Sequence, residues 1–320
     1  MLWSGRGKKV SSGAYREWCL ALASGVLCID EVHERGRTIL FATDPLLDAT
    51  VGWKVVKKND QASMDAFLDE LKAAGFHPEV VITDGSPLYK ESLTARWRDV
   101  AHQLCIFHVL QDANREILDA VRDIRKGLPE PRRHRRGRPS KRGRPRRKDD
   151  RRAFITEHLH LVVKKAESWT EEDRQAWARL LEISPRFELL REFVEKLYGC
   201  FEKGISPQQA RYRRTRLVND RRFTSDPHLR KVVVMLAPEK FEKMIVFLSH
   251  PQAERTNNHV ERNNRAFRLV QKTRYRRRRT HTIELALWLH IACRWRKHPK
   301  YQLALKLRKQ SNPATRRRAA

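Results

Sequence analysis

Hydrophobic positions between Gly25 and Ile106 form short runs and helical repeats, which predict the elements of an α/β domain. The predicted elements, in chain order, are strands at 25–30, 37–43 and 51–57, a helix at 61–74, a strand at 79–83, a short helix at 88–97, and a strand at 102–106 that leads into another helix. Three successive strands favour an antiparallel meander. Strands separated by helices favour parallel addition through crossover connections.

The remainder of the chain changes character twice. Residues 125–152 are mostly Arg, Lys, Pro and Gly, which cannot bury a core, so we expect a disordered basic segment there. Residues 153–250 predict helices throughout, with Thr170 before three acidic residues as one helix start. Four prolines suit first turns of further helices: Pro185, Pro207, Pro227 and Pro238. A last helical region, about 256–277, carries Glu261.

These changes predict how the chain divides into parts. We expect a short N-terminal segment, an α/β core in two parts, a helical insertion between them that contains the basic segment, and a basic tail. The N-terminal segment is 1–24, and the two parts of the core are 25–109 and 256–300. The insertion is 110–255, and the tail is 301–320.

The net charge of the chain indicates which class of molecule it binds. Its 320 residues include 68 Lys and Arg against 38 Asp and Glu, a formal net charge of +30. Such an excess favours a polyanionic partner, and nucleic acid is the natural one, because neutralising phosphates releases condensed counterions. An ordinary basic protein, such as a ribosome-associated one, is the alternative that composition leaves open.

Membrane and secretory features are weak in this sequence. No apolar run approaches the roughly 20 residues of a membrane span. The apolar stretch Trp18–Ile29 has the length of a signal-peptide core, but no small-residue cleavage site follows before Asp30. Five scattered cysteines without a Cys-x-x-Cys pair argue against a disulfide framework or zinc finger and favour a reducing cytoplasm.

Two carboxylates stand where predicted strands end. Asp30 closes the first apolar run and Asp84 the fourth, so both can converge at one edge of an open sheet. Metal-assisted phosphoryl transfer uses such carboxylates to hold two hard cations about 4 Å apart. The alternatives are a strand-end cap at Asp30, with Glu31, Glu34 and Asp44 as rivals, and an ordinary Asp-Gly turn at Asp84.

A third acid is expected from a helix that passes nearby. Glu261 follows Asn257 and Asn258 and precedes two more asparagines, which are poor helix formers but suit a polar site. The alternative is a solvated surface carboxylate, with Glu254 and Glu284 as rival acids.

Four segments in fixed order carry a family resemblance. They are Leu27-Cys-Ile-Asp30, Val80-Val-Ile-Thr-Asp84-Gly-Ser-Pro-Leu-Tyr89, Cys105-Ile-Phe-His108 and Thr256-Asn-Asn-His-Val-Glu261. Together they resemble bacterial insertion-sequence transposases of the DDE class, over about residues 25–279. The Cys-x-x-His after the second Asp is similar to that of Mutator-like elements.

The resemblance implies a fold and an activity. The fold would be a ribonuclease-H-like mixed sheet with a large all-α insertion, and Asp30, Asp84 and Glu261 would be the catalytic metal ligands. They would hold two Mg²⁺ ions, which Mn²⁺ can replace, and support cleavage and strand transfer of double-stranded DNA at element ends and target. The resemblance also implies a homo-oligomer on DNA, in the bacterial cytoplasm at the nucleoid and away from membranes.

Cys105 and His108 lack two further partners at the usual spacing of a zinc site. We expect Cys105 to pack at a strand end and His108 to lie next to the active site. Direct contact of His108 with the scissile phosphate is the alternative.

Basic residues cluster in two places. Two Arg-Gly-Arg-Pro repeats resemble AT-hooks, whose arginines enter narrow minor grooves; a generic basic linker is the alternative. Their arginines are Arg136, Arg138, Arg142 and Arg144. A second cluster follows Glu261 and favours a phosphate-tracking surface: Arg265, Arg268, Lys272 and Arg274. For Trp169 and Trp177 in the insertion we favour helix packing over stacking on a flipped base.

Two other functions fit the same residues. One is a non-catalytic DNA-binding remnant of a transposase, and the other is a ribonuclease-H-like nuclease without strand transfer. Relatives usually carry an N-terminal zinc or helix-turn-helix module, whereas fewer than 30 residues precede the first predicted strand here. We therefore expect a truncated copy or half of a split element, in which the module that recognises element ends is either missing or supplied separately.

Overall fold

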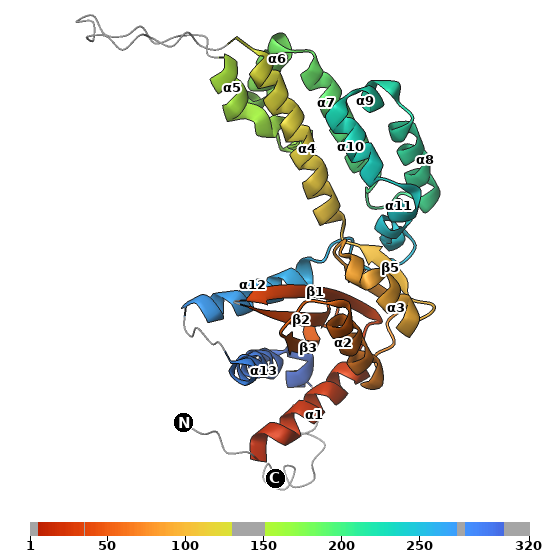
Figure 1. The fold of residues 1–320 in the computed structure, drawn as a ribbon, viewed down its shortest axis with the longest axis vertical. Helices are drawn as coiled ribbons and strands as arrows, with labels where there is room; N and C mark the ends of the chain where they lie inside the picture. The colour runs from red at the N-terminus through yellow and green to blue at the C-terminus, as the bar shows by residue number, and fades with distance from the viewer. Residues whose placement is uncertain (1–5, 35, 130–150, 274–278, 304–320) are drawn as a thin grey trace, which may run out of the picture. The chain divides into compact units, whose positions relative to one another are not determined.

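The computed structural model describes residues 6–34, 36–129, 151–273 and 279–303 (Figure 1). The chain forms two compact units. The first, the sheet unit, comprises Met1–Ile106 and His250–Ala320, and the second, the helical unit, comprises Phe107–Ser249. The sheet unit is therefore discontinuous in sequence, because the helical unit is inserted into it.

A five-stranded mixed sheet organises the sheet unit. Its strands are β1 (Val26–Glu34), β2 (Arg37–Asp44), β3 (Ala49–Val56), β4 (Val80–Thr83) and β5 (Ala101–Leu104). Their order is β3-β2-β1-β4-β5, with β1, β2 and β3 antiparallel and β4 and β5 added in parallel. This is an α/β, ribonuclease-H-like arrangement, and it confirms the predicted order of strands and crossovers.

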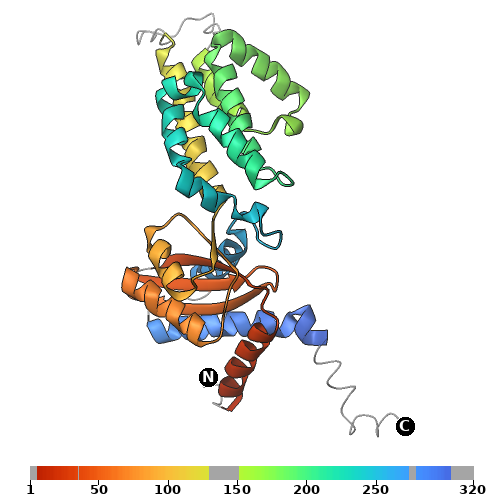
Figure 2. The same ribbon diagram turned by 90° about the vertical axis from the view of Figure 1, so that its right-hand side faces the viewer.

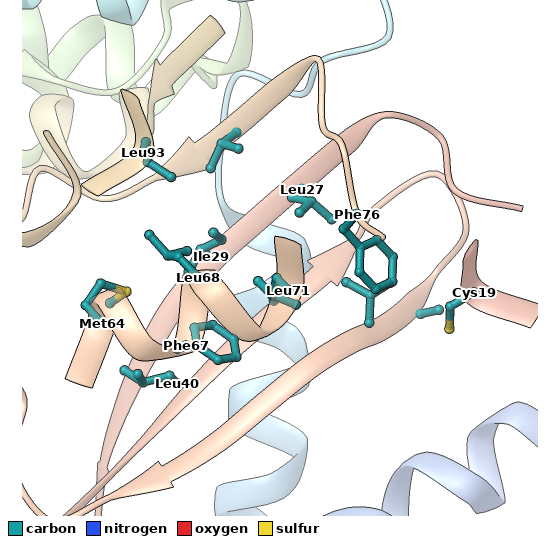
Figure 3. Close-up of a cluster of buried hydrophobic side chains, with 14 of the residues drawn as sticks. Cys19, Leu27, Ile29, Leu40, Met64, Phe67, Leu68, Leu71, Phe76 and Leu93 are labelled. Atoms are coloured by element: carbon teal, nitrogen blue, oxygen red, sulfur yellow. The ribbon is translucent and has the colours of Figure 1, made fainter. Parts of the chain in front are cut away.

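Alternation along the strands gives the sheet two buried faces. Leu27, Ile29 and Leu40 belong to the main hydrophobic cluster, into which helix α2 (Gln61–Ala73) inserts Phe67 and Leu71 (Figure 3). The fit is close at β3, because a Cβ on Gly52 would lie 2.5 Å from Leu71 Cδ2. The opposite face carries Phe41, whose ring packs 6.2 Å from Phe267 of α12 (Asn258–Thr273).

Two helices at the ends of the described chain cover the strand β3. They are α1 (Arg6–Ala21) and α13 (Thr280–Lys297). Tyr15 of α1 lies 5.8 Å from Trp288 and 5.1 Å from Trp295 of α13, measured between ring centroids, and its hydroxyl donates to Thr50 O at 2.7 Å. The sequence did not predict α1, and the apolar stretch Trp18–Ile29 proves to be the end of this helix, a turn at Gly25 with φ +82°, and the start of β1.

The helical unit contains no strand among its described residues (Figure 2). Its helices are α4 (Ile106–Gly127, whose first residue belongs to the sheet unit), α5 (Arg151–His158), α6 (Glu171–Ile183), α7 (Arg186–Gly199), α8 (Pro207–Val218), α9 (Arg221–Ser225), α10 (Pro227–Met235) and α11 (Pro238–Met244). Thr170 begins α6 through reciprocal hydrogen bonds with Asp173, as predicted. Pro207, Pro227 and Pro238 lie in first turns, whereas Pro185 is the residue that precedes α7.

Two tryptophans of the helical unit pack against their neighbours. The rings of Trp169 and Trp177 lie 5.4 Å apart, and Trp177 lies 6.3 Å from Phe187. The guanidinium of Arg191 stacks over Trp169 at 4.9 Å. These contacts agree with the packing role that the sequence favoured.

The predicted basic segment at 125–152 is helical at both ends. Helix α4 continues to Gly127, with Arg125 and Lys126 in its last turn, where basic side chains suit a helix C-terminus, and α5 already begins at Arg151. Residues 130–150 lie outside the described part of the chain. No helix among the described residues has the length and apolar character that crossing a membrane requires. The five cysteines are all free thiols.

Candidate active site

Asp30 and Asp84 occupy equivalent positions on neighbouring parallel strands. The pairing of β1 with β4 includes Cys28 opposite Ile82, and each Asp lies two residues beyond this pair. Because side chains alternate along a strand, both carboxylates continue the face on which Cys28 and Ile82 lie. That is also the face on which α12 packs.

The start of α12 is fixed to the strand that carries Asp30. The Asn257 side chain donates from Nδ2 to Ile29 O at 3.1 Å, and its backbone N–H donates to Cys105 Sγ at 3.2 Å. Two turns later Asn264 donates from Nδ2 to Asp30 Oδ2 at 2.6 Å. The asparagines that disfavour a helix in isolation therefore hold it against β1, with Glu261 in its first turn.

A buried histidine, which the sequence did not single out, ties α12 to the rest of the sheet unit. His259 is 2% exposed, and its two ring nitrogens lie 2.9 Å from Thr43 Oγ1 and 2.7 Å from Asp48 Oδ1. Arg294 of α13 donates to the same Asp48 oxygen at 3.1 Å and to Asn263 Oδ1. The only signal in the sequence was a histidine two residues before Glu261.

His259→Ala is expected to destabilise the sheet unit by about 1–3 kcal/mol, because it removes a buried ring and deprives the buried Thr43 hydroxyl of this partner. The measurement is the urea midpoint at constant slope. His281→Ala is the control, since His281 is exposed at the start of α13, and it should change stability by less than about 0.5 kcal/mol. Equal effects of both substitutions would contradict a special role for His259.

The three predicted acids influence one another electrostatically. Burial raises the pKa of Asp30 to about 7, a backbone hydrogen bond from Glu31 opposes the shift, and the charges of Glu31, Asp84 and Glu261 add to it. Asp84 is half-buried, and its Oδ1 accepts a hydrogen bond from Ser86 N at 2.9 Å. A cluster of repelling carboxylates is a site at which a bound cation would relieve the repulsion.

The acids that were alternatives to the three predicted metal ligands lie in different environments. Asp44 is buried at the end of β2, where it accepts hydrogen bonds from Ser24 N, Ser24 Oγ, Leu46 N and Leu47 N. Glu284 is exposed on α13. Glu31 follows Asp30 directly and also borders the site.

Asp30 and Glu261 open into a cavity of about 770 Å³ with a cationic wall. Its lining consists of Asp30, Glu31, Asn258, Glu261, Arg262, Asn264, Arg265, Arg268, Leu269 and Lys272. Within the described part of the chain, the four cations of this lining form no ion pair. The predicted residues Arg265, Arg268 and Lys272 thus border the acids, whereas Arg274 and the four arginines of the repeats lie outside the described residues.

The Cys-x-x-His motif divides between the two units. Cys105 is 1% exposed at the end of β5, where its sulfur accepts the hydrogen bond from Asn257, as expected for a packed cysteine. His108 is half-buried in the first turn of α4 and belongs to the helical unit.

Without metal, the protein is expected to lose stability as the pH rises from about 5 to 8. The folded-state pKa of Asp30, about 7, exceeds the unfolded value of about 3.9. Between these two values the folded chain binds more protons than the unfolded chain. The stability that the protonated Asp30 contributes is therefore lost as the pH rises through about 7. Tm of wild type and of Asp30→Asn, measured in EDTA, should diverge in their pH dependence; parallel curves would contradict the raised pKa.

The donor set suits a hard divalent cation. Asp30, Asp84 and Glu261 offer carboxylate oxygens, the ligand type that Mg²⁺ and Mn²⁺ prefer. The hydrogen bond from Asn264 engages one oxygen of Asp30 and fixes its orientation.

Comparison with known proteins identifies the family. No curated protein matches the chain. The model of the transposase family DDE_Tnp_ISL3 matches residues 27–284, a range that holds all three acids, the helical unit and, apart from Val26, the five strands. The chain therefore belongs to this family of DDE transposases.

Proposed function

We propose that this transposase cleaves DNA and joins strands by metal-dependent phosphoryl transfer, with Asp30, Asp84 and Glu261 as metal ligands. The observation that carries the proposal is that Asp30 and Asp84 each lie two residues beyond the last pair of β1 with β4, on the face that receives the Glu261 helix. The family supports DNA as the substrate. Two Mg²⁺ ions in such a site supply activation of the attacking water or 3′-hydroxyl and stabilisation of the leaving oxygen.

The protein contributes orientation and charge. Asn264 orients Asp30, and the hydrogen bond from Ser86 N orients Asp84. Asn257 anchors the first turn of the helix that presents Glu261. These bonds preorganise the carboxylates, so that little reorganisation is needed when the reaction begins.

The cationic wall of the cavity is proposed to bind the DNA backbone. Arg265, Arg268 and Lys272 follow Glu261 along α12 and line the same cavity. Since no described carboxylate neutralises them, their charge is available to phosphates. Phosphate contacts of this kind position the strand and carry no sequence information.

We also propose that copies of the chain assemble on DNA, because joining both ends of an element to target DNA requires two sites. Sedimentation of the protein with and without element-end DNA tests this: a complex that holds a single chain on paired ends would contradict it.

A strand-transfer assay separates the three candidate activities. Labelled element-end DNA is incubated with the protein, Mg²⁺ and a supercoiled plasmid. Joined product is expected; cleavage without joining would instead indicate a nuclease, and DNA binding without either product would indicate a remnant.

A further inference from the structure

Glu31 is a fourth carboxylate at the site, and both of its oxygens are engaged. It follows Asp30 in β1 and lines the same cavity, although alternation directs the two side chains to opposite faces of the strand. Its Oε1 accepts a hydrogen bond from Asn59 Nδ2 at 3.2 Å, and its Oε2 accepts one from the Tyr89 hydroxyl. Tyr89 is completely buried in the main hydrophobic cluster.

Tyr89 belongs to the same loop as Asp84. It ends the short helix η1 (Pro87–Tyr89), five residues after Asp84. The loop is also held by Gln61, whose Nε2 donates to Leu88 O at 3.1 Å. The Tyr89–Glu31 bond therefore connects the segment that carries Asp84 with the strand that carries Asp30.

Backbone pairing does not make this connection in the structure described. The pairs between β1 and β4 end at Cys28 and Ile82, two residues before the acids. Beyond that point the backbone of β4 bonds to the other side, where Cys105 N donates to Thr83 O at 2.8 Å. The spacing between Asp30 and Asp84 thus depends on side chains.

We propose that Tyr89 and Glu31 form a positioning pair that sets this spacing and withholds the Glu31 carboxylate from the bound cations. Four carboxylates lie at the site, but with Glu31 held by Tyr89 only those of Asp30, Asp84 and Glu261 would remain as metal ligands. This inference rests on the proposed function, because it concerns how the same site holds its metal.

Tyr89→Phe tests the pair, since it keeps the buried ring and removes only the hydroxyl. We expect the affinity for Mn²⁺, measured by calorimetry on the full chain without DNA, to fall about tenfold or more, as for other residues that orient metal ligands. Higher Mn²⁺ should restore most of the cleavage rate, and DNA affinity in EDTA should not change. Unchanged Mn²⁺ affinity would overturn the proposal.

Tyr15→Phe is the matched control. Tyr15 is 4% exposed and donates a buried hydrogen bond to Thr50 O in the same unit, away from the cavity. Both variants should lose similar thermal stability, but only Tyr89→Phe should weaken Mn²⁺ binding. An equal loss in both would mean that general loosening, and not positioning, is responsible.

Substitutions of Glu31 separate positioning from ligation. Glu31→Gln retains an oxygen that accepts from Tyr89 and should keep Mn²⁺ affinity within about threefold, whereas Glu31→Ala should behave like Tyr89→Phe. A loss in Glu31→Gln as large as in Asp30→Asn would make Glu31 a ligand and overturn the pair. If wild type binds no Mn²⁺, or if Asp84→Asn binds it as wild type does, the proposed metal site itself fails, and the pair fails with it.

Discussion

Asp84→Asn is expected to lower the rate of DNA cleavage and joining by at least about 10³-fold. Losing a ligand charge removes several kcal/mol of transition-state stabilisation by the bound cations, and each 1.4 kcal/mol corresponds to about a factor of ten. The asparagine retains a side-chain oxygen for the hydrogen bond from Ser86 N, so the loop should keep its shape. The measurement is single-turnover cleavage of labelled element-end DNA at saturating protein.

DNA affinity should barely change in this variant, because Asp84 lies among the acids and the cations of α12 remain. Asp99→Asn is the control for charge, since Asp99 is exposed in the connection before β5. It should cleave at the wild-type rate. Strand joining by Asp84→Asn at a rate near that of wild type would show that the catalytic acids lie elsewhere.

Replacing Arg265, Arg268 and Lys272 together by Gln is expected to weaken DNA binding about 10²–10³-fold near 0.1 M salt. The salt dependence is the sharper measurement. Each lost phosphate contact should lower the slope of log K against log salt by about 0.9, so three should lower it by about 2.7. Fluorescence anisotropy titrations at several salt concentrations give both quantities.

The helical unit offers a control with the same change in net charge. Arg211, Arg213 and Arg222 pair with Glu242, Glu202 and Glu192 at 2.7, 2.6 and 2.8 Å. Because their charge is already neutralised, replacing these three arginines by Gln should leave the salt slope nearly unchanged. A similar loss of slope in both triple variants would mean that net charge alone, and not the wall of the cavity, attracts DNA.

The strands and the placement of Asp30 and Asp84 at neighbouring strands could be predicted because their signals are local. An apolar run that ends in Asp30 or Asp84 is visible within a few residues, and parallel neighbours bring such ends together. Glu261 needed the family resemblance, since a polar helix with one carboxylate is common. Its anchoring asparagines were noticed as poor helix formers, but the atoms that they bind could not be read from the sequence.

The undetected features depend on partners far away in the chain. Helix α1 is held by residues far away in the chain, since Tyr15 contacts Trp288 and Trp295 of α13. His259 meets Thr43 across 216 residues, and Tyr89 meets Glu31 across 58. The hydrophobic periodicity of a short stretch of sequence predicts its secondary structure. It carries no information about which distant residue a side chain will contact in the fold.

The inserted helical unit has a consequence for synthesis of the protein. Asp30 leaves the ribosome long before Glu261, because the whole of Phe107–Ser249 is translated between the two parts of the sheet unit. At about 5–20 residues per second, the interval lasts roughly 10–50 seconds. During that time β1 to β5 lack α12, so a nascent chain has neither the complete acid set nor the cationic wall. The proposed catalytic site therefore cannot assemble until nearly all of the sheet unit has emerged from the ribosome.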